Sequence, residues 1–194
     1  SLATVLMASH NKQARSEHHP GMGALPLERG VAFRVWAPHA DRVFVTGTFD
    51  NWAADTHELK HEGNGFWYDE VNTASVGDEY RYLMVNGDQR LWRIDPYARC
   101  VTHSAGNGIV CARRRADQAS FDPPPLNELV VYEMHVGTFN RQADDVSGEF
   151  EDVVARLDHL RELGINAIEV MPPTEFAGSA SWGYNPAHIF AIES

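Results

Sequence analysis

Four side chains in the first half of the sequence could together bind a ring that carries hydroxyl groups. Trp52 and Trp92 offer indole faces, Arg81 offers a cation with several N–H donors, and Asn107 offers an amide. Aromatic faces pack against C–H surfaces, and guanidinium and amide groups exchange hydrogen bonds with hydroxyls. This is the composition of a sugar-binding surface. The same tryptophans could instead be core or interface residues, and the residue types alone leave both interpretations open.

The elements that must position these four residues are expected to be short strands. From Val31 onward, runs rich in Val, Phe, Tyr and Trp are separated by turn residues at the spacing typical of an immunoglobulin-like β-sandwich. Trp36 and Trp67 are assigned to its core. The expected strands are Val31–Trp36, Arg42–Thr46, Gly65–Val71, Asp78–Val85, Gln89–Arg93 and Gly108–Ala112.

The second half of the chain has a different pattern, in which strand, helix and strand alternate. Apolar runs predict strands at Leu129–Met134 and Ile165–Val170, and apolar residues at threes and fours predict a helix over Glu149–Leu163. Ser147 is the expected N-cap, and Gly164 stands where a left-handed residue ends a helix. We interpret this βαβ unit as the first portion of a truncated (β/α)8 TIM barrel, because a complete one takes about 250 residues.

Composition shifts predict four segments along the chain. Residues 1–22 show no periodicity and are expected to be a flexible tail, in which His18 and His19 are solvated. Residues 23–115 form the β-sandwich module, residues 116–128 form a proline-rich linker, and residues 129–194 form the start of the barrel. The predicted fold class is therefore multidomain, β plus α/β.

Charge and cysteine content exclude several classes of partner. The formal net charge of −11 disfavours nucleic acids, whose phosphates are bound by clustered Lys and Arg. No apolar run is long enough to cross a membrane and no leader is recognised, so a cytoplasmic location is expected. Cys100 and Cys111 flank a turn, but cytosolic thiols are held reduced, so we expect no disulfide. No metal site and no cofactor are predicted.

Several runs of residues resemble one enzyme family. Phe33–Pro38, Thr46–Trp52 and Asp95–Ala98 resemble the N-terminal starch- and glycogen-type carbohydrate-binding module of glycogen branching enzymes. Tyr132–Phe139 and Trp182–Pro186 resemble the first third of the catalytic barrel of the same enzymes. The chain is thus identified as a member of the α-amylase superfamily, glycoside hydrolase family thirteen. It is similar to branching enzymes, maltooligosyltrehalose trehalohydrolases and debranching enzymes.

The resemblance implies retaining chemistry on α-glucans, with a carboxylate nucleophile and a carboxylic general acid about 5 Å apart. Those acids belong to later barrel strands, so no catalytic residue is nominated here. Tyr184 is expected to stack on a sugar ring, and His135 either lines the same cleft or bonds to backbone. Trp182 is a substrate-binding candidate that could equally serve loop packing. Glu133, Glu169 and Glu175 match no catalytic motif, and the first two are expected to be barrel-interior carboxylates.

The sandwich resembles the glycogen-binding module of the β subunit of AMP-activated kinase, in which two Trp, a Lys and an Asn occupy positions that match Trp52, Trp92, Arg81 and Asn107. The resemblance therefore implies an α-glucan partner: glycogen, starch or maltooligosaccharide. The expected function is that of the N-terminal part of an α-glucan-active glycoside hydrolase or glucanotransferase. A non-catalytic glycogen-binding module and a structural β-sandwich are the alternatives. An incomplete barrel would also expose strand edges, which predicts self-association.

Overall fold

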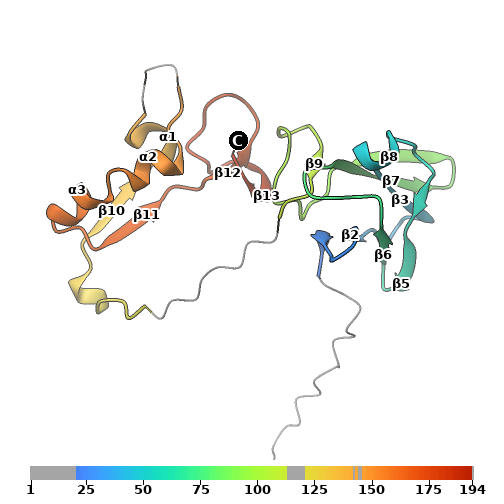
Figure 1. Cartoon of the computed structure of the whole chain (residues 1–194), viewed down its shortest axis with the longest axis horizontal. Coiled ribbons are helices and arrows are strands. Elements are labelled where there is room, and N and C mark those ends of the chain that lie inside the picture. The colour runs from blue at the N-terminus through green and yellow to red at the C-terminus, as the bar shows by residue number, and fades with distance from the viewer. Residues whose placement is uncertain (1–20, 113–120, 142, 144–145, 194) are drawn as a thin grey trace, which may run out of the picture.

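The computed structural model describes residues 21–112, 121–141, 143 and 146–193. Figure 1 shows a β-sandwich at one end of the molecule and a small α/β unit at the other, with a C-terminal hairpin between them. Predictions that concern residues 1–20, including His18 and His19, lie outside the described residues, as does most of the expected boundary near residues 113–120.

The β-sandwich consists of two antiparallel sheets. The first has the order β1-β2-β6-β5, and the second has the order β4-β3-β7-β8, with β9 also paired to β7. A 3-10 turn, η1 (Thr48–Asp50), follows β3. The strands are β1 (Gly23–Pro26), β2 (Val31–Trp36), β3 (Arg42–Gly47), β4 (His57–Glu58), β5 (Lys60–Gly63), β6 (Phe66–Val71), β7 (Glu79–Asn86), β8 (Gln89–Arg93) and β9 (Gly108–Ile109).

The predicted sandwich is confirmed, and the strand bounds differ little from those expected. Val31–Trp36 and Gln89–Arg93 are correct, and three of the other four differ by one residue at one or both ends. The strand predicted over Gly108–Ala112 ends at Ile109. The prediction missed β1, β4 and β5, because these strands are short and carry few β-branched or aromatic residues.

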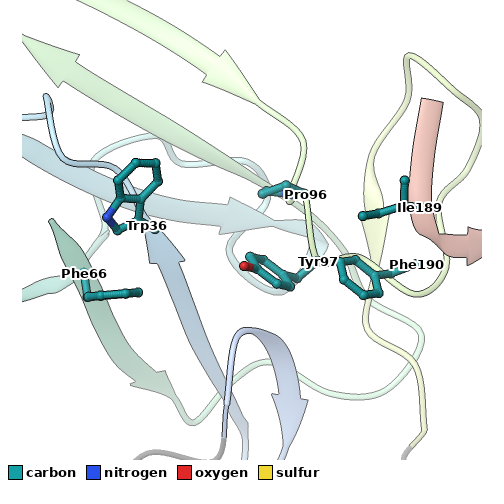
Figure 2. Close-up of a pocket in the computed structure, with 6 residues that line it drawn as sticks. All are labelled: Trp36, Phe66, Pro96, Tyr97, Ile189 and Phe190. Atoms are coloured by element: carbon teal, nitrogen blue, oxygen red, sulfur yellow. The ribbon is translucent and has the colours of Figure 1, made fainter. Parts of the chain in front are cut away.

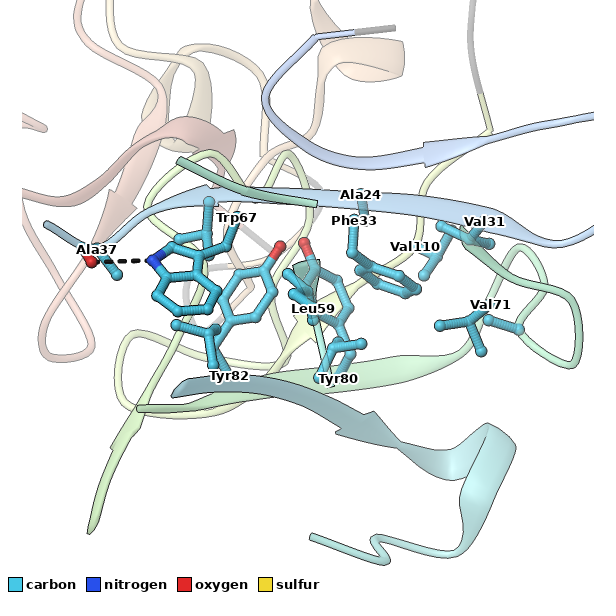
Figure 3. Packing of buried hydrophobic residues seen from close by; sticks show 14 residues of the cluster. Ala24, Val31, Phe33, Ala37, Leu59, Trp67, Val71, Tyr80, Tyr82 and Val110 are labelled. Atoms are coloured by element: carbon cyan, nitrogen blue, oxygen red, sulfur yellow. Dashed lines mark hydrogen bonds between the residues drawn. The ribbon is translucent and has the colours of Figure 1, made fainter. Parts of the chain in front are cut away.

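The core lies between the two sheets. Alternation along β7 turns Tyr80 and Tyr82 inward, where Tyr80 packs edge-on against Phe33 of β2, with ring centroids 5.1 Å apart. Figure 3 shows both tyrosine rings reaching from one sheet toward the other, with the indole of Trp67 beside them. That indole donates to the carbonyl of Ala37 at 3.0 Å, which satisfies its buried N–H. Trp67 is therefore a core residue, as predicted.

A single buried carboxylate joins the core to the chain that leaves β8. Asp95 is fully buried, and its Oδ2 accepts a hydrogen bond from Tyr80 Oη at 2.7 Å. Its Oδ1 accepts the backbone N–H of Tyr97 at 2.8 Å. Burial raises the pKa of Asp95 to about 6, although these hydrogen bonds oppose the shift. The carboxylate thus fixes the Asp95–Tyr97 turn at a cost in desolvation.

The second half contains the predicted strand-helix-strand order. Strands β10 (Val131–Met134) and β11 (Ala167–Val170) pair in parallel, which confirms their expected relation. Helices α2 and α3 cover them through a small cluster of Met134, Val153 and Leu160. The remaining elements are η2 (Leu126–Glu128), α1 (Val136–Phe139), α2 (Phe150–Val154), α3 (Leu157–Glu162), β12 (Thr174–Phe176) and β13 (Pro186–Ile192).

The single helix expected over Glu149–Leu163 is wrong, and so is its N-cap. The N–H of Arg156 bonds to Val153 O, three residues back, so α2 ends in a tight turn before α3 begins. The N-cap is Glu149, whose backbone N–H donates to Asp152 Oδ2 at 2.9 Å in a capping box, so Ser147 is not the N-cap. Gly164 has φ 86°, which confirms the predicted left-handed end.

Candidate functional site

The four residues singled out in the sandwich line one open groove. Trp52, Arg81, Trp92 and Asn107 surround a hollow of about 430 Å³ on the outer face of the second sheet. We call it the Trp52–Trp92 groove. Trp92 comes from β8, Arg81 from β7, Trp52 from the turn after η1, and Asn107 from the loop that leads into β9. Residues far apart in sequence therefore meet, as the sequence analysis anticipated.

A break in the sheet edge creates this groove. Strands β8 and β9 pair with the same strand, β7, but β8 ends opposite Tyr82 and β9 begins opposite Tyr80. Arg81 lies between these two pairings, with its side chain on the face opposite the core tyrosines. The chain from residue 94 to residue 107 leaves the sheet at this point and returns, so its end forms one wall of the groove.

The turn after η1 holds Trp52 in an unusual backbone conformation. Trp52 has φ 63°, in the left-handed region that bulky residues rarely occupy. Asp50 compensates, because its Oδ1 accepts the backbone N–H of Trp52 at 3.0 Å, while the same N–H reaches Gly47 O at 2.8 Å. Backbone strain that is stabilised by surrounding hydrogen bonds often occurs at functional positions. Here the strained residue is Trp52, whose indole lines the groove.

Two further contacts fix this turn against the start of β7. Thr48 Oγ1 donates to Asp78 Oδ1 at 2.6 Å and accepts the backbone N–H of Glu79 at 3.2 Å. Burial opposes ionisation of Asp78, but the hydrogen bonds from Thr48 and Ser75 lower its pKa overall. A Cβ on Gly47 would lie 2.1 Å from Glu79 O, so only glycine permits this close approach. Trp52 is thereby held at a fixed distance from Arg81.

The loop from Val101 to Gly108 carries Asn107 and is braced from several sides. Thr102 and Asn107 are joined by two hydrogen bonds of 2.9 Å, one between backbone groups and one from Asn107 N to Thr102 Oγ1. The guanidinium of Arg81 donates from Nε to Gly106 O at 3.0 Å and from Nη2 to Ala105 O at 2.9 Å. Arg81 was predicted as a contact for the ligand, and the structure adds that it holds the opposite wall of the groove.

The expectation that Cys100 and Cys111 stay reduced is wrong in this structure, which joins them in a disulfide. Their Cα atoms are 6.3 Å apart, within the usual range for a disulfide. The expectation rested on the cellular compartment, whereas the tertiary structure brings the two residues together: Ile109 N donates to Cys100 O, and Val101 bridges to Gly108. The bond therefore closes the loop that carries Asn107.

Removing this disulfide is expected to cost stability. In the chain-entropy model, closing a loop of 11 residues restricts the unfolded chain by about 3 kcal/mol. A Cys100→Ser/Cys111→Ser double variant should therefore lose roughly that free energy of unfolding, as measured by urea denaturation. Adding a reductant should bring the wild-type chain to the same value and leave the variant unchanged. A reductant that has no effect on the wild type would show that the bond does not form in solution.

The second set of candidates lies at the carboxyl ends of β10 and β11. His135 Nε2 lies 3.0 Å from Ser181 O, so of its two expected roles the structure displays the hydrogen bond to backbone. Ser181 Oγ also donates to Asn185 Oδ1 and accepts the N–H of Gly183. Trp182 and Tyr184 project from this loop with 75% and 65% of their surface exposed. In the described chain Trp182 is therefore not packed within its loop, and its role in substrate binding stays a prediction.

A larger hollow of about 520 Å³ lies between the sandwich and the C-terminal hairpin. Figure 2 shows the rings of Tyr97 and Phe190 side by side, stacked with centroids 5.3 Å apart. Trp36, predicted to be in the core, is instead 55% exposed at its rim, because it is the last residue of β2 and points away from the opposite sheet. Its indole N–H already donates to Asn64 O. The lining residues are Trp36, Phe66, Pro96, Tyr97, Ile189 and Phe190.

The three acids noted in the second half have contrasting surroundings. Glu133 and Glu169 face each other in register on β10 and β11 and are exposed, on the face opposite Met134 and the helices, so their expected place inside a complete barrel stays a prediction. No further strand of the described chain covers them. Glu175 is buried, and burial, together with the nearby carboxylate of Glu193, raises its pKa. It lies in the β12–β13 hairpin, apart from the Trp52–Trp92 groove.

The described part of the chain contains neither a cluster of candidate metal ligands nor a helix that could cross a membrane. No group of three or more His, Cys, Asp or Glu residues there is arranged to hold a metal ion. None of the helices described is long and apolar enough to cross a membrane.

Comparison with known proteins relates the two halves to one group of enzymes. Residues 21–98 match the family model of carbohydrate-binding module 48, the isoamylase N-terminal domain. The chain is 32% identical over 186 residues to the 1,4-alpha-glucan branching enzyme GlgB 2 of Xanthomonas campestris, covering 89% of this chain and 25% of the relative. It is 29% identical over 169 residues to the malto-oligosyltrehalose trehalohydrolase of Saccharolobus solfataricus, covering 86% and 28%. The chain thus spans about a quarter of the length of these curated relatives.

Solved structures agree with this relation across both halves. Pullulanase type I of Bacillus subtilis, in complex with maltose, matches 91% of this chain and 28% of its own, with a TM-score of 0.66 and 26% identity. The pullulanase of Anoxybacillus sp. LM18-11, in complex with maltotetraose, matches 90% of this chain and 30% of its own, with a TM-score of 0.71. At 23% identity the second match supports the fold alone.

Proposed function

Because the chain belongs to the α-amylase superfamily and carries a carbohydrate-binding module 48 over residues 21–98, we propose that it binds α-glucans through the Trp52–Trp92 groove. One observation carries the proposal: four residues from four separate segments, each suited to contact a sugar, line the same hollow. Packing of the sandwich core does not require these four residues in the groove, because the groove lies on the outer face of the second sheet.

The physical chemistry of the groove suits short stretches of linked glucose. The indoles of Trp52 and Trp92 are each exposed over about two fifths of their surface, which leaves faces for the C–H sides of sugar rings. Arg81 and Asn107 supply polar atoms at the edge for hydroxyls. The groove is open at the surface, so a long glucan could lie across it without its end entering a closed pocket. Glycogen, starch and maltooligosaccharides are the proposed ligands.

The second part of the proposal concerns catalysis. We infer that the chain is the N-terminal part of an α-glucan-active glycoside hydrolase or glucanotransferase, in which β10, β11 and the intervening helices begin a (β/α)8 barrel. Residues 23–115 would form the binding module, residues 116–128 the linker and residues 129–194 the barrel portion. Tyr184, His135 and Trp182 would face substrate at the carboxyl ends of the strands. The chain of 194 residues by itself is expected to be inactive, and no nucleophile or general acid is nominated in it.

The proposal is tested by measuring the affinity of the 194-residue chain for maltoheptaose by calorimetry, and for glycogen by retardation in native gels. A turnover assay on the same samples accompanies both. We expect binding without release of reducing sugar or formation of branches. Absence of binding to both ligands would refute the groove as a glucan site. Turnover would refute the statement that the catalytic acids lie outside this chain.

Self-association through the exposed β10 and β11 edges stays a prediction of the same model. Light scattering of the purified chain over a range of concentrations tests it, and a monomer at every concentration would contradict it.

A further inference from the structure

Glu79 contacts Asn107, one of the residues that line the groove, and was not among the site residues expected from the sequence. It precedes Arg81 by two residues on β7, so strand alternation places both side chains on the same face. Its Oε2 accepts a hydrogen bond from Asn107 Nδ2 at 2.6 Å. Glu79 and Asn107 are 28 residues apart in sequence and are both half-buried, so the contact spans the gap between β7 and the loop that leads into β9.

This contact determines which atom of Asn107 can serve a ligand as acceptor. An ionised carboxylate only accepts hydrogen bonds, so the amide must turn its Nδ2 toward Glu79. The backbone of Asn107 is held separately, through its two hydrogen bonds to Thr102. With backbone and amide nitrogen both fixed, Oδ1 is the side-chain atom of this groove residue that can accept a hydrogen bond from a ligand.

The guanidinium of Arg81, which lines the same groove, only donates hydrogen bonds. Arg81 uses Nε and Nη2 to hold the carbonyls of Ala105 and Gly106. None of the hydrogen bonds found within the described residues uses its Nη1, which leaves N–H donors on a second residue that lines the groove. The groove therefore presents an acceptor and a donor next to each other.

We propose that Glu79 is a positioning residue, which fixes Asn107 as an acceptor beside the donor Arg81 so that the groove recognises two adjacent hydroxyls of one sugar ring. One hydroxyl donates to Asn107 Oδ1, and its neighbour accepts from Arg81 Nη1. This inference rests on the proposed glucan-binding function. It adds that ligands with such a hydroxyl pair unsubstituted are preferred, and that a residue without contact to the sugar controls the affinity.

The test reverses the direction of the Glu79–Asn107 hydrogen bond. In Asn107→Asp two carboxylates would meet where the hydrogen bond of 2.6 Å now lies, so the side chain should turn away and affinity for maltoheptaose should fall roughly tenfold or more. In the double variant Glu79→Gln/Asn107→Asp, the new amide donates to the new carboxylate, whose second oxygen faces the groove. Affinity should return to within about threefold of the wild type. Glu28→Gln, at an exposed position outside the groove, is the matched control.

A second readout needs no ligand. In the wild type, the two side-chain amide protons of Asn107 should exchange slowly with solvent in NMR spectra, because one is held by Glu79. In Glu79→Ala, exchange should be faster and affinity for maltoheptaose about tenfold lower.

The outcomes separate the two proposals. A wild-type chain that binds neither maltoheptaose nor glycogen refutes the proposed function, and with it a role for Glu79 in binding. A wild-type chain that binds, together with a double variant no better than Asn107→Asp, overturns the positioning role alone. Identical amide exchange in the wild type and Glu79→Ala overturns it too. Restored affinity in the double variant, with slow amide exchange in the wild type, supports it.

Discussion

Alanine at Trp52 or at Trp92 is expected to reduce the affinity for maltoheptaose by about 10- to 100-fold, and alanine at both positions to abolish detectable binding. Each indole supplies a large apolar face to a sugar ring, and losing one such face costs about 1.5 to 3 kcal/mol. Both residues line the same groove, so neither can replace the other. Calorimetric titration of each variant with maltoheptaose measures the effect.

Trp36→Ala is the matched control for these variants. Trp36 is also an exposed tryptophan of the sandwich, but it lies at the rim of the apolar hollow near Phe190. The Trp36→Ala variant should bind maltoheptaose with the affinity of the wild type. Thermal unfolding of all variants shows whether they remain folded, which matters most for Trp52, because its turn also contacts β7. If Trp52→Ala and Trp92→Ala bind as tightly as the control, the groove is not the binding site.

The buried carboxylate of Asp95 is expected to make the stability of this chain depend on pH. Its pKa is about 6 in the folded protein and near 3.9 in an unfolded chain. Between these values the folded state binds more protons than the unfolded state, so the free energy of unfolding falls as pH rises. The loss is complete above about pH 6 and amounts to about 3 kcal/mol. Stability from this group is thus greatest below about pH 4.

Asp95→Asn isolates this contribution. The amide carries no charge to desolvate, and it can still accept the N–H of Tyr97 and pair with Tyr80 Oη. We expect the difference in free energy of unfolding, wild type minus variant, to fall by about 2 to 3 kcal/mol from pH 4 to pH 7. Urea denaturation at intervals of half a pH unit measures it. His188 also acts electrostatically on Asp95 and is present in both proteins. Comparison with the variant therefore separates the pH dependence due to Asp95 from that due to His188.

Asp88→Asn serves as the control, because it makes the same chemical change at an exposed position in the turn after β7. A wild-type minus Asp95→Asn difference that stays constant with pH would contradict the assigned cause of the shift.

The sandwich could be predicted from the sequence because its signals are local. The alternation of Tyr80, Arg81 and Tyr82 and the turn residues between runs determine which side chains face the core and where strands stop. The four groove residues could be named because their types suit a sugar and because their positions match those of a glycogen-binding module that the sandwich resembles. The parallel pairing of β10 and β11 also follows from the continuous apolar runs of the two strands.

Other features were predicted wrongly, for different reasons. Trp36 was assigned to the core because it is a large apolar residue, although the alternation that buries Val31, Phe33 and Val35 places it on the outer face of β2. The break in the predicted helix depends on a local tightening at Arg156. The pairing of Cys100 with Cys111 depends on the bridge between Val101 and Gly108.

The sequence by itself determined the fold class of the sandwich, the order of elements in the second half, and the residue types that line the Trp52–Trp92 groove. Only the tertiary structure decided that β8 and β9 leave a gap opposite Arg81, that a disulfide closes the loop of Asn107, and that Glu79 orients the amide of that residue. The physical reason is that backbone periodicity is encoded over a few neighbouring residues. Hydrogen bonds such as Glu79–Asn107 join positions 28 residues apart, and they exist only once both sheet and loop are folded.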